Sequence, residues 1–293
     1  MIYIIITSYK DLGITKAVNS FLSQDIKEKY KIIVSDPFPE TQEIIKKQFP
    51  NSFGKQVEFF LDPGEGKSYA LNVILEQIYS QNTNDIIILT DGDVYVSKNS
   101  ISAIMKAFED KKLGCVTGKP VPLDSKKNMF GYWSHVVFSG IDKVREKLSD
   151  EGKFFECSGY LFAIRNGILQ GFPLETSEDS IIPYLFWQKG YKIKYVPNAE
   201  VYVLNNYTWK SWLKQKIRNI KGHENLSLLV RDMPRTKSFW NEIKFGLLFA
   251  LTYPKSIKEI FFTFTLFIAR LYIYIKAFYD IKLKKKTYKD AFR

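Results

Sequence analysis

The chain has 293 residues, of which 45% are hydrophobic and 25% are charged, so it can bury a sizeable core and a globally disordered chain is excluded. Only two cysteines are present, which excludes a disulfide framework and favours a reduced, cytosolic setting. The net charge of +12 lies almost entirely in the tail: residues 1–206 carry 24 Lys and Arg against 25 Asp and Glu, whereas residues 207–293 carry 19 against 6.

The first hundred residues alternate short apolar runs with segments of helical periodicity. The N-terminal run has no basic region and no small-residue cleavage site, so we expect the first strand there and not a signal peptide. This alternation predicts an α/β fold with a mostly parallel sheet and covering helices. The expected strands are Ile2 to Thr7, Lys31 to Ser35, Val57 to Leu61 and Ile86 to Thr90, and the expected helices lie near 13–24, 40–48 and 67–79.

The middle of the chain continues the pattern less regularly, without an internal repeat or a low-complexity linker. The expected elements are a helix near 98–109, a strand at 114–117, an amphipathic helix over 132–148, a strand from Gly159 to Ile164, a helix over 178–189, two short strands at Ile193 to Val196 and Glu200 to Val203 split by Pro197-Asn198, and a helix from Trp209 to Val230.

The basic tail contains two apolar helical stretches, 239–253 and 257–279, separated by Pro254. A spanning helix needs about 20 apolar residues; the first stretch is too short and the second is interrupted by Arg270. Basic residues interleaved with aliphatic and aromatic ones suit an anionic membrane surface and not a nucleic acid. We expect the pair to lie in the interface, held at the cytoplasmic side by lysines between 282 and 286. The alternative is a helical hairpin packed on the protein's own core.

Asp91-Gly92-Asp93 directly follows an apolar run that predicts a buried strand. Two carboxylates one residue apart repel each other unless a positive charge lies between them. A divalent cation, Mn²⁺ or Mg²⁺, which itself neutralises a diphosphate, is the simplest such partner. The alternative is a solvated turn without a metal.

Other polar residues stand at the ends of neighbouring strands, where open α/β sheets bind ligands. Thr7 and Tyr9 follow the first strand and Asp36 follows the second. Gly66-Lys67-Ser68 invites a P-loop interpretation, but that motif requires a glycine where Leu61 stands. Lys67 is therefore expected to approach a nucleotide in another way, with a P-loop-like hydrolase or kinase as the alternative.

Two further candidates lie at helix positions. Glu178 and Asp179 begin a helix behind Ser177, where acidic residues suit the helix dipole and a carboxylate can also act as a general base. Gln215 and Arg218 share one face of a later helix and could bind a diphosphate or an acceptor sugar; the alternative is a solvated basic face.

In this order, the motifs resemble those of the family 2 glycosyltransferases, which have the GT-A fold. The resemblance covers residues 1–225 and is closest to the membrane-associated branch of cellulose, chitin and hyaluronan synthases and lipid-linked glycan enzymes. The motifs are Thr7-Ser8-Tyr9, Asp36, Gly66 to Asn72, Asp91 to Val94, Gly159 to Arg165 and Ser177-Glu178-Asp179.

The resemblance implies a role for each site residue. Thr7, Tyr9 and Asp36 would contact the base and ribose of a UDP- or GDP-linked sugar, and Lys67 would lie near them. Asp91 would face the sugar nucleotide and Asp93 would ligate the metal, while Asp179 would be the catalytic base beside Glu178. Gln215 and Arg218 match a Gln-x-x-Arg-Trp motif of the polymer synthases.

Asn219 stands where the polymer synthases have the tryptophan that stacks under the acceptor sugar. We therefore expect an inverting transfer of one sugar, to a lipid-linked or membrane-proximal acceptor. The expected organisation is a GT-A domain over 1–225 and a membrane-association region over 226–293. A non-catalytic membrane-binding scaffold is the third hypothesis, and it predicts no metal-dependent nucleotide binding.

Overall fold

The structure is a computed structural model that describes residues 1–174, 176–205, 208–234 and 241–280. The lysines expected to hold the tail at headgroups lie outside these ranges. The chain divides into two compact units. The first, here called the sheet unit, comprises Met1–Val121, Leu148–Leu174 and Glu178–Val203. The second, the helical unit, comprises Pro122–Lys147, 175–177 and the chain from Leu204 onward.

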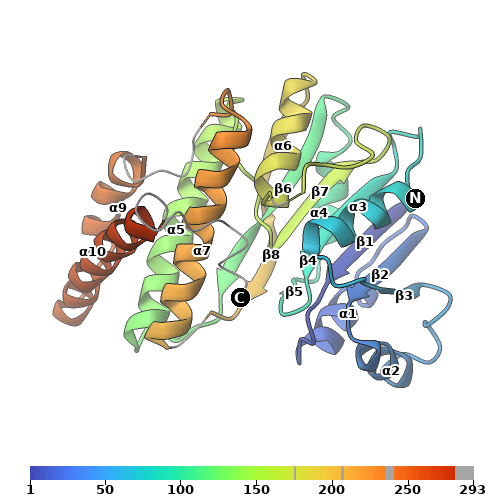
Figure 1. Ribbon diagram of the computed structural model, residues 1–293, viewed down its shortest axis with the longest axis horizontal. Helices are drawn as coiled ribbons and strands as arrows, with labels where there is room; N and C mark the ends of the chain where they lie inside the picture. The colour runs from blue at the N-terminus through green and yellow to red at the C-terminus, as the bar shows by residue number, and fades with distance from the viewer. Residues whose placement is uncertain (175, 206–207, 235–240, 281–293) are drawn as a thin grey trace. The chain divides into compact units, whose positions relative to one another are not determined.

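The sheet unit is built on one eight-stranded sheet of order β3-β2-β1-β4-β7-β6-β8-β5 (Figure 1). The pairs β1–β2, β1–β4 and β2–β3 are parallel, whereas β4–β7, β6–β7 and β5–β8 are antiparallel, so the sheet is mixed. The α/β fold is confirmed. The strands are β1 Ile2–Thr7, β2 Tyr30–Asp36, β3 Val57–Leu61, β4 Ile86–Asp91, β5 Tyr95–Val96, β6 Leu113–Pro122, β7 Leu161–Arg165 and β8 Lys192–Val203.

The helices of the sheet unit begin and end close to the expected positions. They are α1 Ile14–Leu22, α2 Pro39–Gln48, α3 Lys67–Gln77, α4 Ser100–Ala107 and α6 Glu178–Gln188. The helical unit contains most of α5 Met129–Asp150, together with α7 Trp209–Leu229, a π-helical turn Glu242–Gly246, α9 Leu247–Thr252 and α10 Ile257–Phe278.

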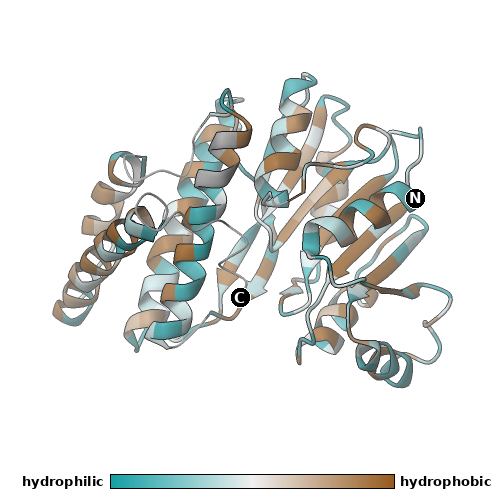
Figure 2. Cartoon of the chain, viewed as in Figure 1, coloured by the Kyte–Doolittle hydropathy of each residue, from teal (hydrophilic) through white to brown (hydrophobic). Residues whose placement is uncertain are grey.

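The core of the sheet unit is formed by the continuous apolar strands. Ile4, Ile5 and Ile6 of β1 are fully buried, and Ile86 to Leu89 of β4 are 3% exposed or less. Strands covered on both faces carry such uninterrupted apolar runs. Figure 2 shows the hydrophobic residues gathered on these strands.

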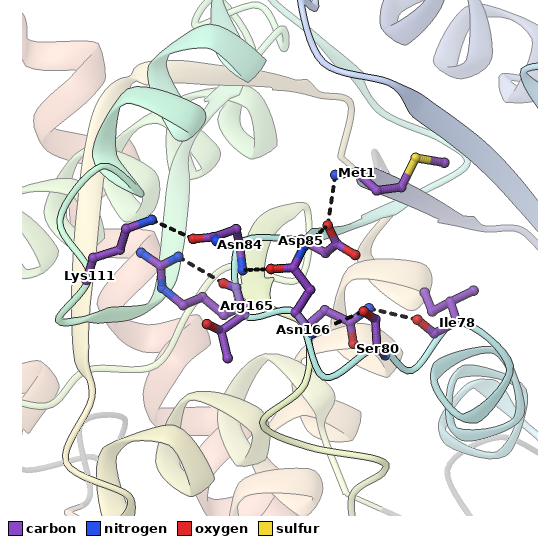
Figure 3. Close-up of polar contacts among 10 residues, drawn as sticks. Met1, Ile78, Ser80, Asn84, Asp85, Lys111, Arg165 and Asn166 are labelled. Atoms are coloured by element: carbon purple, nitrogen blue, oxygen red, sulfur yellow. Dashed lines mark hydrogen bonds and ion pairs between the residues drawn. The ribbon is translucent and has the colours of Figure 1, made fainter.

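The edge at which β4 begins and β7 ends is tied by hydrogen bonds and by the ion pair between the Met1 amino group and Asp85 (Figure 3). The buried Arg165 guanidinium donates to four backbone carbonyl oxygens, those of Leu113 at 2.7 Å, Thr83 at 3.1 Å, Phe108 at 2.7 Å and Asp110 at 2.9 Å. Asn166 donates to the Ile78 carbonyl at 2.7 Å. Arg165 therefore fastens the loops around this edge.

Candidate active site

The parallel register brings the ends of β1 and β4 together at the opposite edge of the sheet. Thr7 and Asp91 are register partners, and the Thr7 hydroxyl lies 3.2 Å from Asp91 Oδ1 and 3.2 Å from the Thr90 carbonyl oxygen. Carboxyl ends of parallel strands share one edge, so the local sequence of each strand fixes this arrangement. Thr7 orients the first carboxylate of Asp91-Gly92-Asp93.

Lys67 connects three elements at this edge. It is the first residue of α3, and its Nζ lies 2.6 Å from Asp91 Oδ1 at the end of β4 and 2.5 Å from Glu178 Oε1 at the start of α6. Burial alone would lower the pKa of Lys67, but the two carboxylates outweigh it and hold the pKa above its ordinary value. The lysine thus neutralises the protein's own carboxylates, which is not the arrangement of a P-loop lysine.

Gly66 makes the turn into α3 possible. Its φ is +101°, a backbone conformation that residues with a side chain rarely adopt. The Gly-Lys pair is therefore explained by backbone geometry at Gly66 and by charge at Lys67.

Glu178 and Asp179 lie in the first turn of α6, as predicted. Desolvation raises the pKa of Glu178, and the neighbouring Asp179 and Asp91 add to this effect against the opposing charge of Lys67. The Asp179 carbonyl accepts a hydrogen bond from Cys157 N at 2.9 Å. A Cβ added at Gly159 would lie 3.7 Å from Asp179 Oδ2, so the glycine leaves room beside this carboxylate.

Asp11 is a carboxylate at this edge that the motif analysis missed. A Cβ added at Gly92 would lie 3.1 Å from Asp11 Oδ2, which places Asp11 against the Asp91-Gly92-Asp93 turn. Partial burial raises the pKa of Asp11, and Asp91 contributes to the shift. In the sequence, its position two residues after Tyr9, close to the end of β1, is what could have pointed to this edge of the sheet.

Asp93 carries the clearest sign of excess negative charge. Desolvation raises its pKa to about 6, with Asp91 and then Asp11 as further causes. The described residues contain no group of three or more His, Cys, Asp or Glu side chains that could hold a metal ion by themselves. Asp91 and Asp93 fit a Mn²⁺ or Mg²⁺ site in which diphosphate and water oxygens complete the shell, because these cations prefer mixed oxygen ligands.

Asp36 and Tyr9 form a second part of this edge. Asp36 is fully buried, and its two oxygens accept hydrogen bonds from Lys10 N at 2.8 Å and Phe38 N at 2.9 Å. Lys10 has a φ of +56°, so Asp36 holds a strained turn. Tyr9 is 74% exposed and its ring meets Phe38 edge-on at 5.1 Å. The exposed Tyr9 ring, in contact with the half-buried Phe38 ring, thus stands beside a buried carboxylate.

Asn72 fastens the loop that leads to α6. Its amide donates to the Phe172 carbonyl at 2.8 Å and accepts from Phe172 N at 2.9 Å. A Cβ added at Gly171 would lie 3.1 Å from Asn72 Oδ1, so a larger residue there would press on the amide. Through Lys67 and Asn72, α3 contacts both Glu178 and the segment preceding it.

Gln215 and Arg218 lie on α7, in the helical unit. Their contact with a nucleotide sugar stays a prediction, as do the individual roles of the residues at the sheet edge. One of the two histidines, His135, has a structural role, because its Nε2 lies at hydrogen-bond distance, 2.8 Å, from the Asp124 carbonyl oxygen.

Comparison with known proteins identifies the family. The family model described as "Glycosyltransferase like family 2" matches residues 1–222. "Probable glycosyltransferase YdaM" of Bacillus subtilis is 24% identical over 80% of this chain and 56% of its own length. "Poly-beta-1,6-N-acetyl-D-glucosamine synthase" of Staphylococcus aureus is 27% identical over 77% of this chain and 55% of its own. The chain spans about half the length of the curated relatives it matches.

Solved structures share the fold. A mannosyltransferase, PcManGT from Pyrobaculum calidifontis in complex with GDP-Man and Mn²⁺, has a TM-score of 0.60 at 15% identity, covering 92% of this chain and 73% of its own. TarS from S. aureus has a TM-score of 0.52 at 16% identity, over 88% and 46% of the two chains. These likenesses confirm the GT-A sheet. The family model, which matches residues 1–222, shows that the chain belongs to the family 2 glycosyltransferases.

Proposed function

We propose that this glycosyltransferase is inverting and uses a divalent cation to move one sugar from a nucleotide-diphosphate sugar to a lipid-linked or membrane-proximal acceptor. The observation that carries the proposal is that Asp91 and Glu178 both contact Lys67, with Asp93 two residues after Asp91 and Asp179 directly after Glu178. This edge carries more negative than positive charge, and a nucleotide diphosphate is negatively charged as well. A shared cation satisfies both.

In the proposed reaction, an acceptor hydroxyl oxygen attacks the anomeric carbon while the bond from that carbon to the diphosphate oxygen breaks. Asp179 takes the proton of the hydroxyl as general base. A single in-line displacement inverts the anomeric carbon, so an α-linked donor gives a β-linked product. A polyprenyl phosphate acceptor is already ionised, and Asp179 would then orient it without taking a proton.

The chain's other residues would bind and orient the donor. Thr7 and Lys67 fix the Asp91 carboxylate, and the exposed Tyr9 beside Asp36 offers a surface for base and ribose. A divalent cation held by Asp91 and Asp93 would neutralise the diphosphate leaving group. Gln215 and Arg218 would meet the diphosphate or the acceptor.

The ligands of the structural neighbours support a proposal for the donor class. The related fold of the mannosyltransferase was solved with GDP-Man and Mn²⁺, and that of TarS also with UDP-GlcNAc, at a TM-score of 0.50 over 90% of this chain. We infer a UDP- or GDP-linked donor. Asn219, in place of a tryptophan, supports the transfer of a single sugar.

The acceptor proposal rests on the tail. We assign a GT-A domain to residues 1–225 and a membrane-association region to 226–293, at the cytoplasmic face. In the described part of the chain, α10 is the helix that is long and apolar enough to cross a membrane, judged by length and composition. Of its most apolar 18-residue stretch, 28% is buried. An apolar helix beside a basic tail suits an acceptor held at a lipid surface.

Ligand-dependent thermal stabilisation tests the proposal. A bound ligand raises the melting temperature by mass action. We expect UDP or GDP compounds to raise it only when Mn²⁺ is present, and Asp93→Asn to abolish that dependence. Asp150→Asn, on a side chain that is 68% exposed, is the matched control. A shift with ATP alone, or no shift with any nucleotide, contradicts the proposal.

A further inference from the structure

Helix α10 has two apolar faces, of which one is buried and the other is exposed. One face is buried in the helical unit through Phe262, Thr263, Leu266, Ala269, Ile273 and Ala277. The opposite face carries eight large apolar side chains that are each more than half exposed, from 51% at Leu271 to 87% at Ile257. This exposed stripe consists of Ile257, Ile260, Phe261, Phe264, Ile268, Leu271, Ile275 and Phe278, which follow one another at intervals of three and four residues except for the neighbours Ile260 and Phe261. Figure 2 shows that hydrophobic residues recur along α10.

A stripe of this length is unusual on a soluble protein. Single exposed apolar residues are normal, but a contiguous row marks an interaction site. α9 adds Leu248, 74% exposed, and Leu251, 60% exposed. The helical unit therefore presents an apolar surface that requires a partner.

The buried face of α10 is fixed by directional bonds near its beginning. Trp133 Nε1 donates to the Phe262 carbonyl oxygen at 2.7 Å, and the hydroxyls of Tyr132 and Thr263 lie 2.8 Å apart. These contacts come from α5. They leave α10 with protein on one side.

α7 continues the contact toward the end of α10. The rings of Trp209 and Tyr272 are 6.2 Å apart, and the buried Lys221 lies 3.5 Å from the buried Asp280. Protein thus accompanies α10 along its whole length, so lipid can reach only the exposed stripe.

The length of α10 alone would permit it to cross a bilayer. Its 22 residues extend about 33 Å, against a hydrocarbon thickness of roughly 30 Å. A crossing would also carry α7 into the hydrocarbon, and α7 has five basic residues within 12 positions: Lys210, Lys214, Lys216, Arg218 and Lys221. Charged side chains in the hydrocarbon are costly. The polar companion helix therefore opposes a spanning orientation.

We propose that α10 lies in the plane of an anionic membrane and inserts its exposed stripe into one leaflet. Charge complementarity names the partner: Lys255 and Lys258 are exposed at the start of the helix, and Lys126 and Lys127 are exposed at the start of the neighbouring α5. Lys258 Nζ lies 3.0 Å from the Lys127 carbonyl oxygen, which gathers these lysines at one end. Basic flanks and an apolar stripe are the features of an interfacial helix. This inference deepens the proposed membrane association and is independent of the transfer reaction.

Depth measurements along the stripe distinguish the orientations. Spin labels would be placed one at a time by Ile257→Cys, Phe264→Cys, Leu271→Cys and Phe278→Cys in the full chain, on vesicles containing phosphatidylglycerol. The native Cys115 and Cys157 are fully buried, and an unsubstituted control measures their labelling. We expect four similar shallow depths, about 5–10 Å below the headgroups. Depths that are greatest at Phe264 and Leu271 and least at both ends would show a spanning helix and overturn the proposal.

A charge-insertion variant tests the partner itself. Phe264→Glu with Ile268→Glu is expected to lower vesicle binding at least tenfold, whereas Ile44→Glu, on an isoleucine of α2 that is 50% exposed, leaves binding unchanged. Donor-dependent thermal stabilisation should persist in both variants, which separates this test from that of the proposed reaction. Unchanged vesicle binding in the double variant, or a dimer that dissociates with it while no form binds lipid, would contradict the proposal.

Discussion

Charged groups are partnered differently at the two edges of the sheet where β4 begins and where it ends. At the edge where β4 begins, the Arg165 guanidinium donates to four backbone carbonyl oxygens. Figure 3 shows further polar groups paired there, with the Met1 amino group at Asp85 and Lys111 at Asn84. At the edge where β4 ends, Asp91, Asp93 and Glu178 gather near one lysine, and the pKa values of Asp93 and Glu178 are raised. The first edge is complete without a ligand, whereas the second lacks positive charge. If the proposed function holds, stability and ligand binding belong to different ends of the same strands.

The largest expected effect is on catalysis, at the charged edge. Asp179→Asn should lower product formation about 10³-fold, equal to roughly 4 kcal/mol of activation free energy, because the amide cannot take the acceptor's proton. The free energy of unfolding should change by less than about 1 kcal/mol, because removing one of several crowded carboxylates relieves repulsion. Steady-state kinetics and urea denaturation measure the two quantities. Activity near that of the wild type would refute the base assignment.

Arg165→Met should show the reverse pattern at the other edge. It leaves four carbonyl oxygens without their donor, so we expect a loss of about 3 kcal/mol in the free energy of unfolding. Activity per folded molecule should stay within about twofold. Urea denaturation at constant temperature gives the stability. A hundredfold loss of activity in the folded fraction would show that the two edges are not separate.

Lys67→Met tests whether the site lysine balances charge. Asp91 and Glu178 would repel each other, and we expect a loss of about 2 kcal/mol at pH 7, moderated because the Lys67 side chain is 35% exposed. Protonation of the carboxylates relieves the repulsion, so the loss should be smaller at pH 5. Denaturation curves at both pH values measure it. An equal loss at the two pH values would point to lost packing instead of lost charge.

Asn72→Ala should act through the loop before α6. Loss of the two Phe172 bonds should cost about 1–2 kcal/mol of stability. If the loop positions Glu178 and Asp179, kcat should fall about tenfold while the KM for the donor stays constant. Asn72→Asp keeps the acceptor for Phe172 N and should recover part of kcat. A KM change with constant kcat would argue against a positioning role.

The smallest effect concerns pH. The folded protein raises the pKa of Asp93 from 3.8 to about 6, so between these values the folded state binds more protons than the unfolded state. The stability of the metal-free protein should therefore fall as pH rises from 4 to 7. We expect less than about 1 kcal/mol, because more than a third of Asp93 stays exposed to solvent, which screens its charge. Asp93→Asn should flatten this profile, and saturating Mn²⁺ with a nucleoside diphosphate should reverse its sign near pH 6.

Local sequence patterns predicted the helices and strands, but they did not predict which strands pair over long distances in the sequence. The periodicity of β1, β4 and α6 lies within each segment, so their bounds agree closely. The expected split at Pro197-Asn198 is wrong, because β8 runs from Lys192 to Val203; both residues are exposed, and proline is tolerated where its missing donor is not required. β5 has two residues, too few for a periodic signal.

The candidate site shows the same limit. The order of the motifs predicted Lys67, Asp91 and Glu178 as site residues. They contact one another because each stands at the end of a strand or the start of a helix at the same edge of the sheet. The amide clamp between Asn72 and Phe172 joins residues 100 positions apart, and no spacing in the sequence encodes it. Asp11 escaped because its role depends on how a turn folds back toward Gly92.

The strand order has a consequence for how the chain assembles. β7 lies between β4 and β6, although β6 precedes it in the sequence, and β5 pairs with β8, which is about a hundred residues away. During synthesis, β4 and β6 leave the ribosome with open edges that wait for residues 161–165. Loops of this length close slowly, and open edges attract other chains. The insertion of β7 closes the open lateral edges of β4 and of one side of β6, while β5 and the other side of β6 wait for β8. Arg165, at the end of β7, fastens the sheet once that insertion is complete.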